Sequence, residues 1–169
     1  MLSDSVRKNE LRDCMVKIKN PAQCRIFFGR GLMSTLLVAA AIIESGGRIL
    51  LARRRSDAPY PLLWEFPGGK VESGEDPKDC VTREIREELA IEVAVEGIYD
   101  VVHYRYPERN VLMLVYHCRW LSGKIQNLEV SEHCWVSPAD IVNFQLLPAD
   151  IPLAKRISEE FIRGDTARL

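Results

Sequence analysis

Three glutamates on one short predicted helix have the type and spacing best suited to chemistry. Glu87 and Glu88 follow Glu84 by three and four residues, so an α-helix brings the carboxylates together. Each like-charged pair at this spacing costs roughly 0.2–0.5 kcal/mol, which calls for a compensating group. One interpretation is a solvated charged face with an Arg83–Glu87 ion pair. The other is a set of hard oxygen ligands for Mg²⁺, or Mn²⁺, which share their coordination shell with substrate phosphates.

A glycine-rich loop leads directly into this helix and favours the metal interpretation. Gly68 and Gly69 follow a proline, and Gly74 comes shortly afterwards. Glycines at these positions let the backbone turn sharply and come close to a ligand. The loop, the carboxylates and an arginine are therefore expected to act together.

The helix that carries the glutamates is predicted over about residues 77–89. Asp76 can cap its first turn, and Pro77 suits the first helical position. Apolar residues recur at every fourth position and predict a buried stripe formed by Val81, Ile85 and Leu89.

The loop and helix together resemble the signature of the Nudix hydrolases. That signature is a Gly, five residues, a Glu, seven residues, then Arg-Glu-apolar-x-Glu-Glu-x-Gly-apolar. The matching positions are Gly69, Glu75, Arg83, Glu84, Ile85, Glu87, Glu88 and Ile91. Ala90 departs from the pattern, because the family usually has a Gly that ends the helix. We expect either a strain of roughly 1 kcal/mol at Ala90 or a slightly different helix end, with activity retained.

Further segments are similar to the MutT-type branch of this family. They are Leu50–Asp57, Trp64–Glu72 and Leu147–Pro152, the last of which resembles a base-contacting segment. Together the similarities cover roughly residues 34–161. They imply an α/β protein with the Nudix fold, in which a mixed β-sheet lies between α-helices.

The resemblance also implies a ligand set for the metal. The Gly69 carbonyl and the carboxylates of Glu84, Glu87 and Glu88 would hold one or more Mg²⁺ ions, which neutralise phosphate charge and help to activate water. Arg83 has the rigid fork that orients a neighbouring carboxylate.

For residues near the Nudix signature, the resemblance implies roles that have alternatives. Glu75 either anchors the loop to the helix, lies in the outer metal shell or forms an ordinary salt bridge. Glu129, six residues before Trp135, would bind metal or accept the proton of the water, with Glu132 as the nearby rival. Which carboxylate acts as the base stays open.

Two basic residues lie next to the expected triphosphate site. Arg54 lies in a basic run that follows a predicted strand, and it would grip phosphates or belong to a solvated loop. Lys70 is given a supporting role.

Base recognition is assigned to Phe66 and Asp150. Alternate residues of a strand face opposite sides, so Phe66 is expected near the base and Trp64 in the core. The MutT-type enzymes that remove oxidised guanine nucleotides have Asn where this chain has Asp150. An ionised Asp only accepts hydrogen bonds and suits the exocyclic amine of cytosine. The alternative for Asp150 is the N-cap of the final helix.

Other elements are predicted from periodicity and turn residues. The expected strands are residues 36–43, 48–52, 93–95, 98–104 and 111–120. Ser137-Pro138 would open a short helix. Pro152 would open a terminal one, and its buried row would be Leu153, Ile157 and Phe161.

The first thirty-two residues differ from the rest, with seven Lys or Arg against three acidic residues. We therefore divide the chain into a basic extension, 1–32, and a Nudix domain, 33–169. The extension is interpreted as a flexible arm, a short interaction helix or the product of an upstream start. It lacks the pattern of a secretory signal, and the apolar run over residues 32–43 is too short to span a bilayer.

Composition limits the partners. A chain of 169 residues with 47% hydrophobic content can bury a core, and its net charge of −1 argues against nucleic-acid polymers as partners. Five cysteines without a C-x-x-C pair favour reduced thiols in a cytoplasmic protein. Zinc is disfavoured, because neighbouring residues of a strand point to opposite faces. A monomer and a homodimer both remain open.

These observations predict a Mg²⁺-dependent hydrolase. It would cleave a nucleoside triphosphate to the monophosphate and pyrophosphate, with a cytosine nucleotide such as CTP or an oxidised purine nucleotide such as 8-oxo-dGTP as substrate, and would serve nucleotide-pool sanitation and DNA repair. The alternatives are a hydrolase of linked nucleoside diphosphates such as ADP-ribose, and a non-catalytic nucleotide-binding module.

Overall fold

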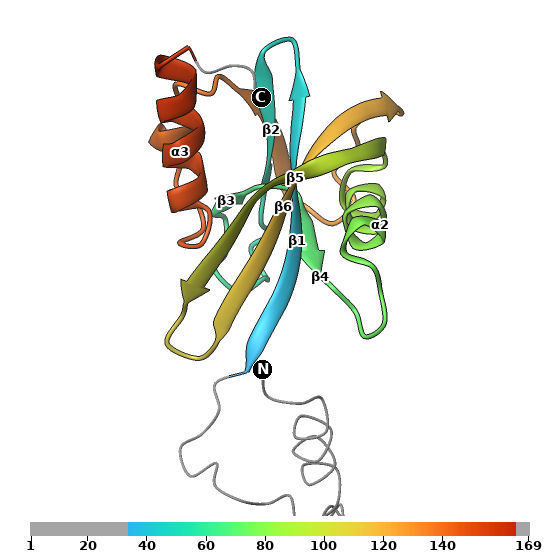
Figure 1. The fold of residues 1–169 in the computed structure, drawn as a ribbon. Helices are drawn as coiled ribbons and strands as arrows, with labels where there is room; N and C mark the ends of the chain where they lie inside the picture. Colours follow the sequence, from blue (N-terminus) through green and yellow to red (C-terminus); the bar gives the residue numbers. More distant parts are fainter. Residues whose placement is uncertain (1–33, 165–169) are drawn as a thin grey trace, which may run out of the picture. The chain divides into compact units, whose positions relative to one another are not determined.

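A computed structural model of the chain describes residues 34–164 (Figure 1). The basic extension predicted over residues 1–32 lies outside the described residues. Its boundary with the Nudix domain therefore stays a prediction.

The described residues form strands, two α-helices and a 3-10 helix. The strands are β1 (Thr35–Ser45), β2 (Arg48–Arg53), β3 (Trp64–Glu65), β4 (Gly68–Lys70), β5 (Glu92–Arg105), β6 (Asn110–Ser122) and β7 (Glu132–Val136). The helices are α2 (Pro77–Leu89), η2 (Ile141–Asn143) and α3 (Ile151–Ile162). None of the helices within residues 34–164 is long and apolar enough to cross a membrane.

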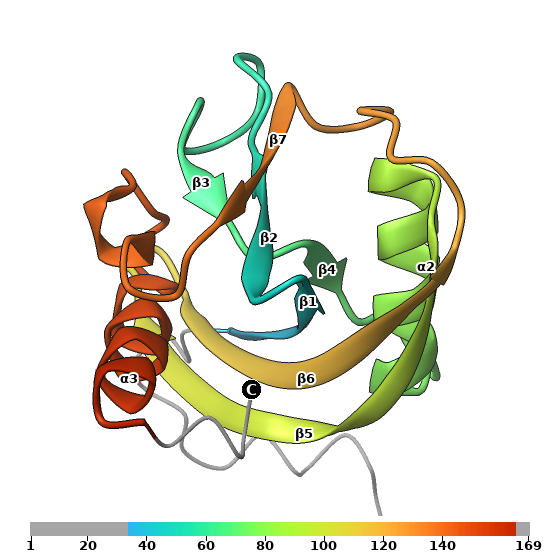
Figure 2. The same ribbon diagram turned by 90° about the horizontal axis from the view of Figure 1, so that it is seen from above.

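The strands form one mixed sheet around β1. The order is β3-β2-β1-β6-β5, and β4 and β7 add to it by pairing with β1 and β2. β1 runs parallel to β6 and antiparallel to β2 and β4. Seen from above, α2 and α3 lie on opposite sides of the strands (Figure 2). The predicted arrangement of a mixed sheet between helices is confirmed.

The unbroken apolar run of β1 is explained by burial on both faces. Ala39, Ala41 and Ile43 join the core beneath α2, whereas Ala40 and Ile42 join the core beneath α3. Side chains alternate across a strand, so a strand covered on both faces has no polar face. Each helix is thereby held against one face of the same central strand.

The predicted strands over residues 93–95 and 98–104 are one strand in the structure. β5 pairs with β6 along its whole length, and its register shifts between Val95 and Gly97 and again between Ile98 and Asp100. Each irregularity moves the alternation of inward and outward side chains by one position. The apolar pattern is interrupted for that reason, although the pairing continues.

Two predictions near the C-terminus are wrong in detail. The short helix is a 3-10 turn that begins at Ile141 rather than at Ser137-Pro138. In α3, Leu153 and Ile157 are fully buried, but Phe161 is 39% exposed. Glu160 takes the buried place instead, because the Tyr99 hydroxyl donates to its carboxylate at 2.6 Å.

Candidate active site

Helix α2 carries its glutamates beside its buried face, where Glu87 is exposed and Glu84 and Glu88 are half-buried. The helix spans Pro77–Leu89 as predicted, and the Asp76 carboxylate accepts the Lys78 N–H at 2.8 Å. The predicted apolar stripe is fully buried, as is Cys80. Because one face is fixed against the sheet, the remaining positions of the helix are free to carry charge.

Arg83 lies at the centre of the acidic face. Its Nε and Nη2 donate to both carboxylate oxygens of Glu75 at 2.7 and 3.0 Å. Its Nη1 donates to Glu84 at 2.8 Å and to Glu87 at 3.0 Å. A planar guanidinium can bind several carboxylates in fixed directions at once. This geometry matches the orienting role predicted for Arg83.

Glu75 ties the glycine loop to the helix. Besides binding Arg83, its carboxylate accepts the backbone N–H of Glu72 at 2.9 Å, and its own N–H donates to the Glu72 carbonyl at 3.1 Å. The hydrogen bonds from Arg83 and Glu72 lower the pKa of Glu75 to about 2. Glu75 is thus a loop anchor in this structure, as one of its predicted roles required.

Two glycines allow the loop to lie against its neighbours. A Cβ on Gly69 would lie 2.3 Å from the carboxylate carbon of Glu84. A Cβ on Gly68 would lie 2.2 Å from the Ala39 carbonyl oxygen, and its φ of +146° is in a region that disfavours other residues. Glycine is therefore required where the loop meets both the helix and the central strand.

The inner part of the acidic face carries more negative charge than its cations balance. Glu88 accepts the Gly68 N–H at 3.2 Å, yet burial and the nearby Glu65 raise the pKa of Glu88 well above its usual range. Burial also raises the pKa of Glu84, although Arg83 opposes this. The pKa of Glu65 is raised by burial despite its ion pair with Arg54 at 2.8 Å.

This excess of hard, negatively charged oxygens fits a divalent cation. Within residues 34–164 no three His, Cys, Asp or Glu side chains form a group that could hold a metal ion on their own. Mg²⁺ is usually bound by one or two carboxylates together with water and substrate phosphates, rather than by an all-protein cage. The donors therefore fit an ion that is shared with a phosphate-bearing substrate.

The two rival acids after β6 have different surroundings. The Glu129 backbone N–H lies 3.4 Å from the Glu88 carbonyl oxygen, so its loop packs against the end of α2. The Glu132 carboxylate, in β7, is bound by Arg53 at 3.2 Å. The choice of Glu129 over Glu132 as the additional acid stays a prediction.

A cleft of about 270 Å³ adjoins the glycine loop on the α3 side of the sheet. Gly68, Gly69, Lys70 and Glu65 line it, together with Phe66 and Asp150. Apolar residues make up much of the remaining wall, which includes Leu36, Val38, Ala40, Val111, Met113 and Leu147. A concave, mainly apolar space with a few polar groups is typical of a small-molecule site.

Arg54 lines this cleft but is already bound by protein groups. Its Nη1 donates to both oxygens of Glu65 at 2.8 and 3.0 Å, and its Nε donates to the Pro59 carbonyl at 2.8 Å. The structure thus gives Arg54 a place in the wall, held by Glu65. The predicted contact with phosphate stays a prediction, as does the supporting role of the exposed Lys70.

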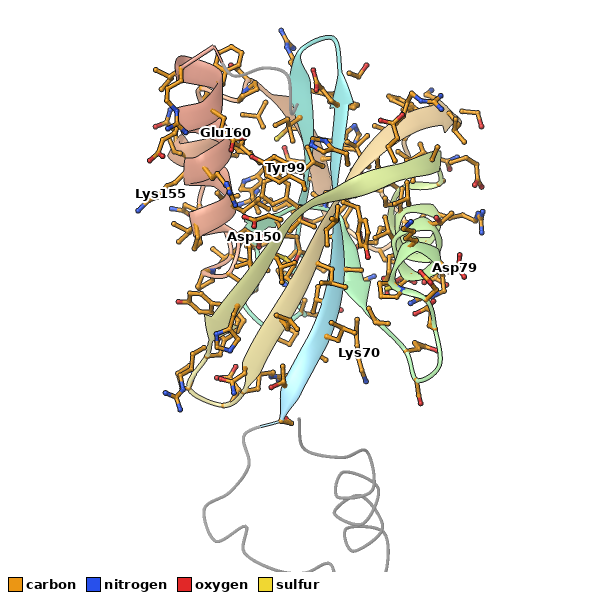
Figure 3. All side chains as sticks on the ribbon, in the orientation of Figure 1. Lys70, Asp79, Tyr99, Asp150, Lys155 and Glu160 are labelled. Atoms are coloured by element: carbon orange, nitrogen blue, oxygen red, sulfur yellow. The ribbon has the colours of Figure 1, made fainter. Side chains whose placement is uncertain are left out.

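Asp150 stands at the N-cap position of α3, but its side chain makes no capping hydrogen bond. The alternative prediction of a capping role is therefore wrong. Its side chain is 3% exposed and lines the cleft beside Phe66. Figure 3 shows Asp150 near α3, on the same side as Tyr99 and Glu160. Phe66 is also buried, whereas Trp64 is partly buried and packs edge to face on Phe144.

Several residues of the cleft are not predicted as site residues from the sequence, among them Glu65, Tyr60 and Tyr106. Glu65 contacts Arg54, and the Tyr60 hydroxyl donates to Glu108 at 3.2 Å while its ring lies 5.2 Å from that of Tyr106. Glu65 lies in the Trp64–Glu72 segment, which the sequence singles out only for its similarity to the MutT-type branch. The sequence did contain one signal for Glu65, because it is an acidic residue next to Phe66, which is expected near the base.

Comparison with known proteins decides the family. A model of the NUDIX domain matches residues 33–160. The chain belongs to the Nudix family. Members of this Nudix family generally use a divalent metal ion such as Mg²⁺. The chain is accordingly an enzyme of the Nudix pyrophosphohydrolase type.

Two curated relatives match most of the Nudix domain. The chain is 42% identical to a CTP pyrophosphohydrolase of Escherichia coli K12 over 122 residues, which cover 72% of this chain and 90% of the relative. It is 29% identical to an 8-oxo-dGTP diphosphatase of the same organism over 126 residues, 74% of this chain and 98% of the relative.

Solved structures share the fold. The solution structure of the E. coli ORF135 protein has a TM-score of 0.66 at 37% identity and covers 80% of this chain and 94% of its own. The crystal structure of a MutT protein from Methanosarcina mazei Go1 has a TM-score of 0.70 at 26% identity and covers 76% of this chain and 96% of its own. The resemblance to the MutT-type branch is thereby confirmed.

Proposed function

We propose that this Nudix enzyme hydrolyses a nucleoside triphosphate to the monophosphate and pyrophosphate in the presence of Mg²⁺. One observation carries the proposal. A single cleft is lined by Gly68 and Gly69, which touch the carboxylates of Glu88 and Glu84, and also by Phe66 and Asp150. A nucleotide in that cleft would have its base and its phosphates in reach of different groups at the same time.

The metal would be held on the acidic face. The Gly69 carbonyl and the carboxylates of Glu84, Glu87 and Glu88 are the proposed ligands, with Glu129 completing the set. Bound Mg²⁺ would supply charge neutralisation for the phosphates and a more acidic water. Mn²⁺ has the same preference for oxygen ligands and is expected to replace it.

The residues around the ligands orient them. Arg83 binds Glu75, Glu84 and Glu87 at the same time, so the carboxylates keep their directions without rearrangement during the reaction. Glu129 would hold metal or accept the proton of the attacking water at its carboxylate. It is suited to either role because it is exposed and its loop is bonded to the end of α2.

The base would lie in the apolar part of the cleft. Phe66 offers an aromatic surface for packing, and Asp150 offers hydrogen bonds in a buried place. Similarity to enzymes named for CTP and for 8-oxo-dGTP supports a cytosine nucleotide or an oxidised purine nucleotide. The cellular role that follows is sanitation of the cytoplasmic nucleotide pool, and so protection of DNA, by a monomer or homodimer.

The experiment is a substrate panel with product identification. The purified full chain is incubated with Mg²⁺ and ordinary, 5-methylated and oxidised nucleoside triphosphates, and with ADP-ribose. Chromatography should show monophosphate and pyrophosphate from one class of triphosphate. Cleavage of ADP-ribose alone would replace the proposal with a linked-diphosphate hydrolase, and no cleavage of any compound would favour a binding module.

A matched pair of variants tests the ligand set. Glu87→Gln should reduce turnover by at least about 100-fold without changing the fold, because a neutral amide is a weak ligand for Mg²⁺. Glu96→Gln is the control, since Glu96 is exposed on β5 and forms an ion pair with Arg119, away from the acidic face of α2. Equal turnover in the two variants would remove Glu87 from the proposed metal site.

A further inference from the structure

Asp150 is a buried carboxyl group without a cation of its own. No ion pair to Asp150 occurs within residues 34–164, and its side chain caps no helix N–H. The Phe66 backbone N–H and the Arg54 guanidinium favour the charged form of Asp150 and lower its pKa, but burial outweighs them. An ionised carboxylate in such a place loses several kcal/mol of hydration, and the usual outcome is that it takes up a proton.

The charged and titratable neighbours do not offset this cost. The Arg54 guanidinium favours the charged form of Asp150, but its Nη1 and Nε are bound to Glu65 and to the Pro59 carbonyl. Glu65, on β3, adds negative charge. The Tyr106 hydroxyl is near Asp150 and has a pKa raised to about 12 by burial, so it is neutral at physiological pH.

The N-terminus of α3 favours the charged form of Asp150, but this effect is weaker than the cost of burying the charge. A helix dipole stabilises a carboxylate at its N-terminus only modestly, even in partly buried places. Desolvation of a fully buried carboxylate exceeds this. Burial and Glu65 accordingly raise the pKa of Asp150 well above its usual range, although Phe66 and Arg54 lower it.

Resting on the proposed function, we propose that Asp150 is a neutral carboxylic acid before the nucleotide binds and reads the base in that form. A neutral acid has one O–H donor and one C=O acceptor, the same pair that an Asn side chain has. The sequence alone favours the assumption of an ionised Asp150, which would only accept hydrogen bonds. Burial in the cleft, which sequence does not reveal, changes that assumption.

A donor and an acceptor side by side match both expected classes of base. On cytosine the O–H would donate to N3 while the C=O accepts from the N4 amine. On an 8-oxo-purine with a protonated N7, the O–H would donate to O6 while the C=O accepts from the N7–H. An ionised Asp150 would make only the accepting bond and would face a lone pair on the other atom. One side chain therefore serves both classes through its proton.

The protonation state is measured first without turnover. In the ¹³C-labelled full chain, the carboxyl resonance that disappears in Asp150→Asn is followed between pH 4 and 9. Its chemical shift should still be that of a neutral acid at pH values where an ordinary Asp is ionised, and should change only well above pH 4. A midpoint near the ordinary value of Asp, about 4, would overturn the inference.

The second measurement is the pH profile of KM for whichever triphosphate the panel identifies. Above the pKa of Asp150, KM should rise by about tenfold per pH unit, since one proton is needed for binding. In Asp150→Asn this rise should be absent, and KM should stay within a few-fold of the wild-type value at low pH. Asp150→Ala should raise KM at every pH.

The control is Asp140→Asn. Asp140 is exposed, stands at the N-cap of η2 and makes no capping hydrogen bond, so its variant should keep the wild-type profile. A KM that rises equally with pH in wild type and Asp150→Asn would refute the inference. If the panel yields no hydrolysis, the proposed function fails, while the resonance still reports whether Asp150 is neutral.

Discussion

Gly69 and Glu84 lie so close together that no side chain fits between them. A Cβ on Gly69 would come within 2.3–2.5 Å of three atoms of the Glu84 carboxyl group. The backbone at residue 69 does not need a glycine for its φ, since only close approach excludes other residues. Loop and helix thus form one interlocked unit at the proposed metal site.

Gly69→Ala should therefore damage the site rather than the fold. The added methyl group would push the Glu84 carboxylate aside, and a displacement of about 1 Å at a catalytic centre costs about 100-fold in rate. Steady-state kinetics with Mg²⁺ would show this fall in kcat/KM. Gly97→Ala is the matched control, because a Cβ there meets nothing within 4 Å. Equal activity in the two variants would contradict the interlocked arrangement.

Arg83→Lys should lower kcat by about 10- to 100-fold while the protein remains folded at the assay temperature. A lysine ammonium cannot bind Glu75, Glu84 and Glu87 in fixed directions as the guanidinium does, and loss of a group that orients ligands typically has this effect. The dependence of rate on Mg²⁺ concentration should shift to higher concentrations. Arg86→Lys, an exposed residue on the same helix that pairs with Glu92, should leave both quantities unchanged.

The Glu75–Arg83 contact should contribute to stability in a defined pH range. The hydrogen bonds from Arg83 and Glu72 lower the pKa of Glu75 to about 2 in the folded protein. Because its pKa is lower in the folded protein, Glu75 stabilises the fold at pH values above its unfolded-state pKa of about 4.5. This stabilisation is lost as the pH falls toward 2. Urea unfolding of wild type and Glu75→Gln should therefore differ at pH 7, and the difference should shrink below about pH 4.5 and vanish as the pH approaches 2. A constant difference across this range would refute the assignment.

Ala90→Gly should stabilise the protein by about 0.5–1 kcal/mol without affecting activity. Ala90 ends α2 with a φ of +58°, and its N–H donates to the Arg86 carbonyl. This left-handed conformation costs a non-glycine residue about 1–2 kcal/mol, whereas glycine adds about 0.4–1 kcal/mol of unfolded-state entropy. The midpoint of urea unfolding should rise. An unchanged or lower midpoint would mean that the strain at Ala90 is relieved elsewhere.

Local sequence pattern was sufficient for helix α2 and for the face that it buries. Asp76, Pro77 and the apolar stripe at every fourth residue act over one or two turns, so they determine the bounds of the helix without reference to the rest of the fold. The end at Ala90 was left open between two alternatives, and the structure selects the strained one.

Elements that depend on distant partners were predicted less well. The sequence predicts two strands where the structure has the single strand β5, because the register shifts of β5 against β6 interrupt the alternation of side chains. Phe161 was expected to be buried because it continues the row of Leu153 and Ile157. Tyr99, on a strand far away in the sequence, selects Glu160 instead.

For the candidate site, the sequence alone determined which residues carry hard oxygen ligands, and on which helix and loop they lie, because the spacing along a helix fixes which side chains are neighbours. The tertiary structure decided which of those groups already have partners: Arg54 with Glu65, and Glu132 with Arg53. It also decided that Asp150 is buried without a cation. Burial and ion pairing depend on which strands and helices pack together, and a linear chain does not specify that residue by residue.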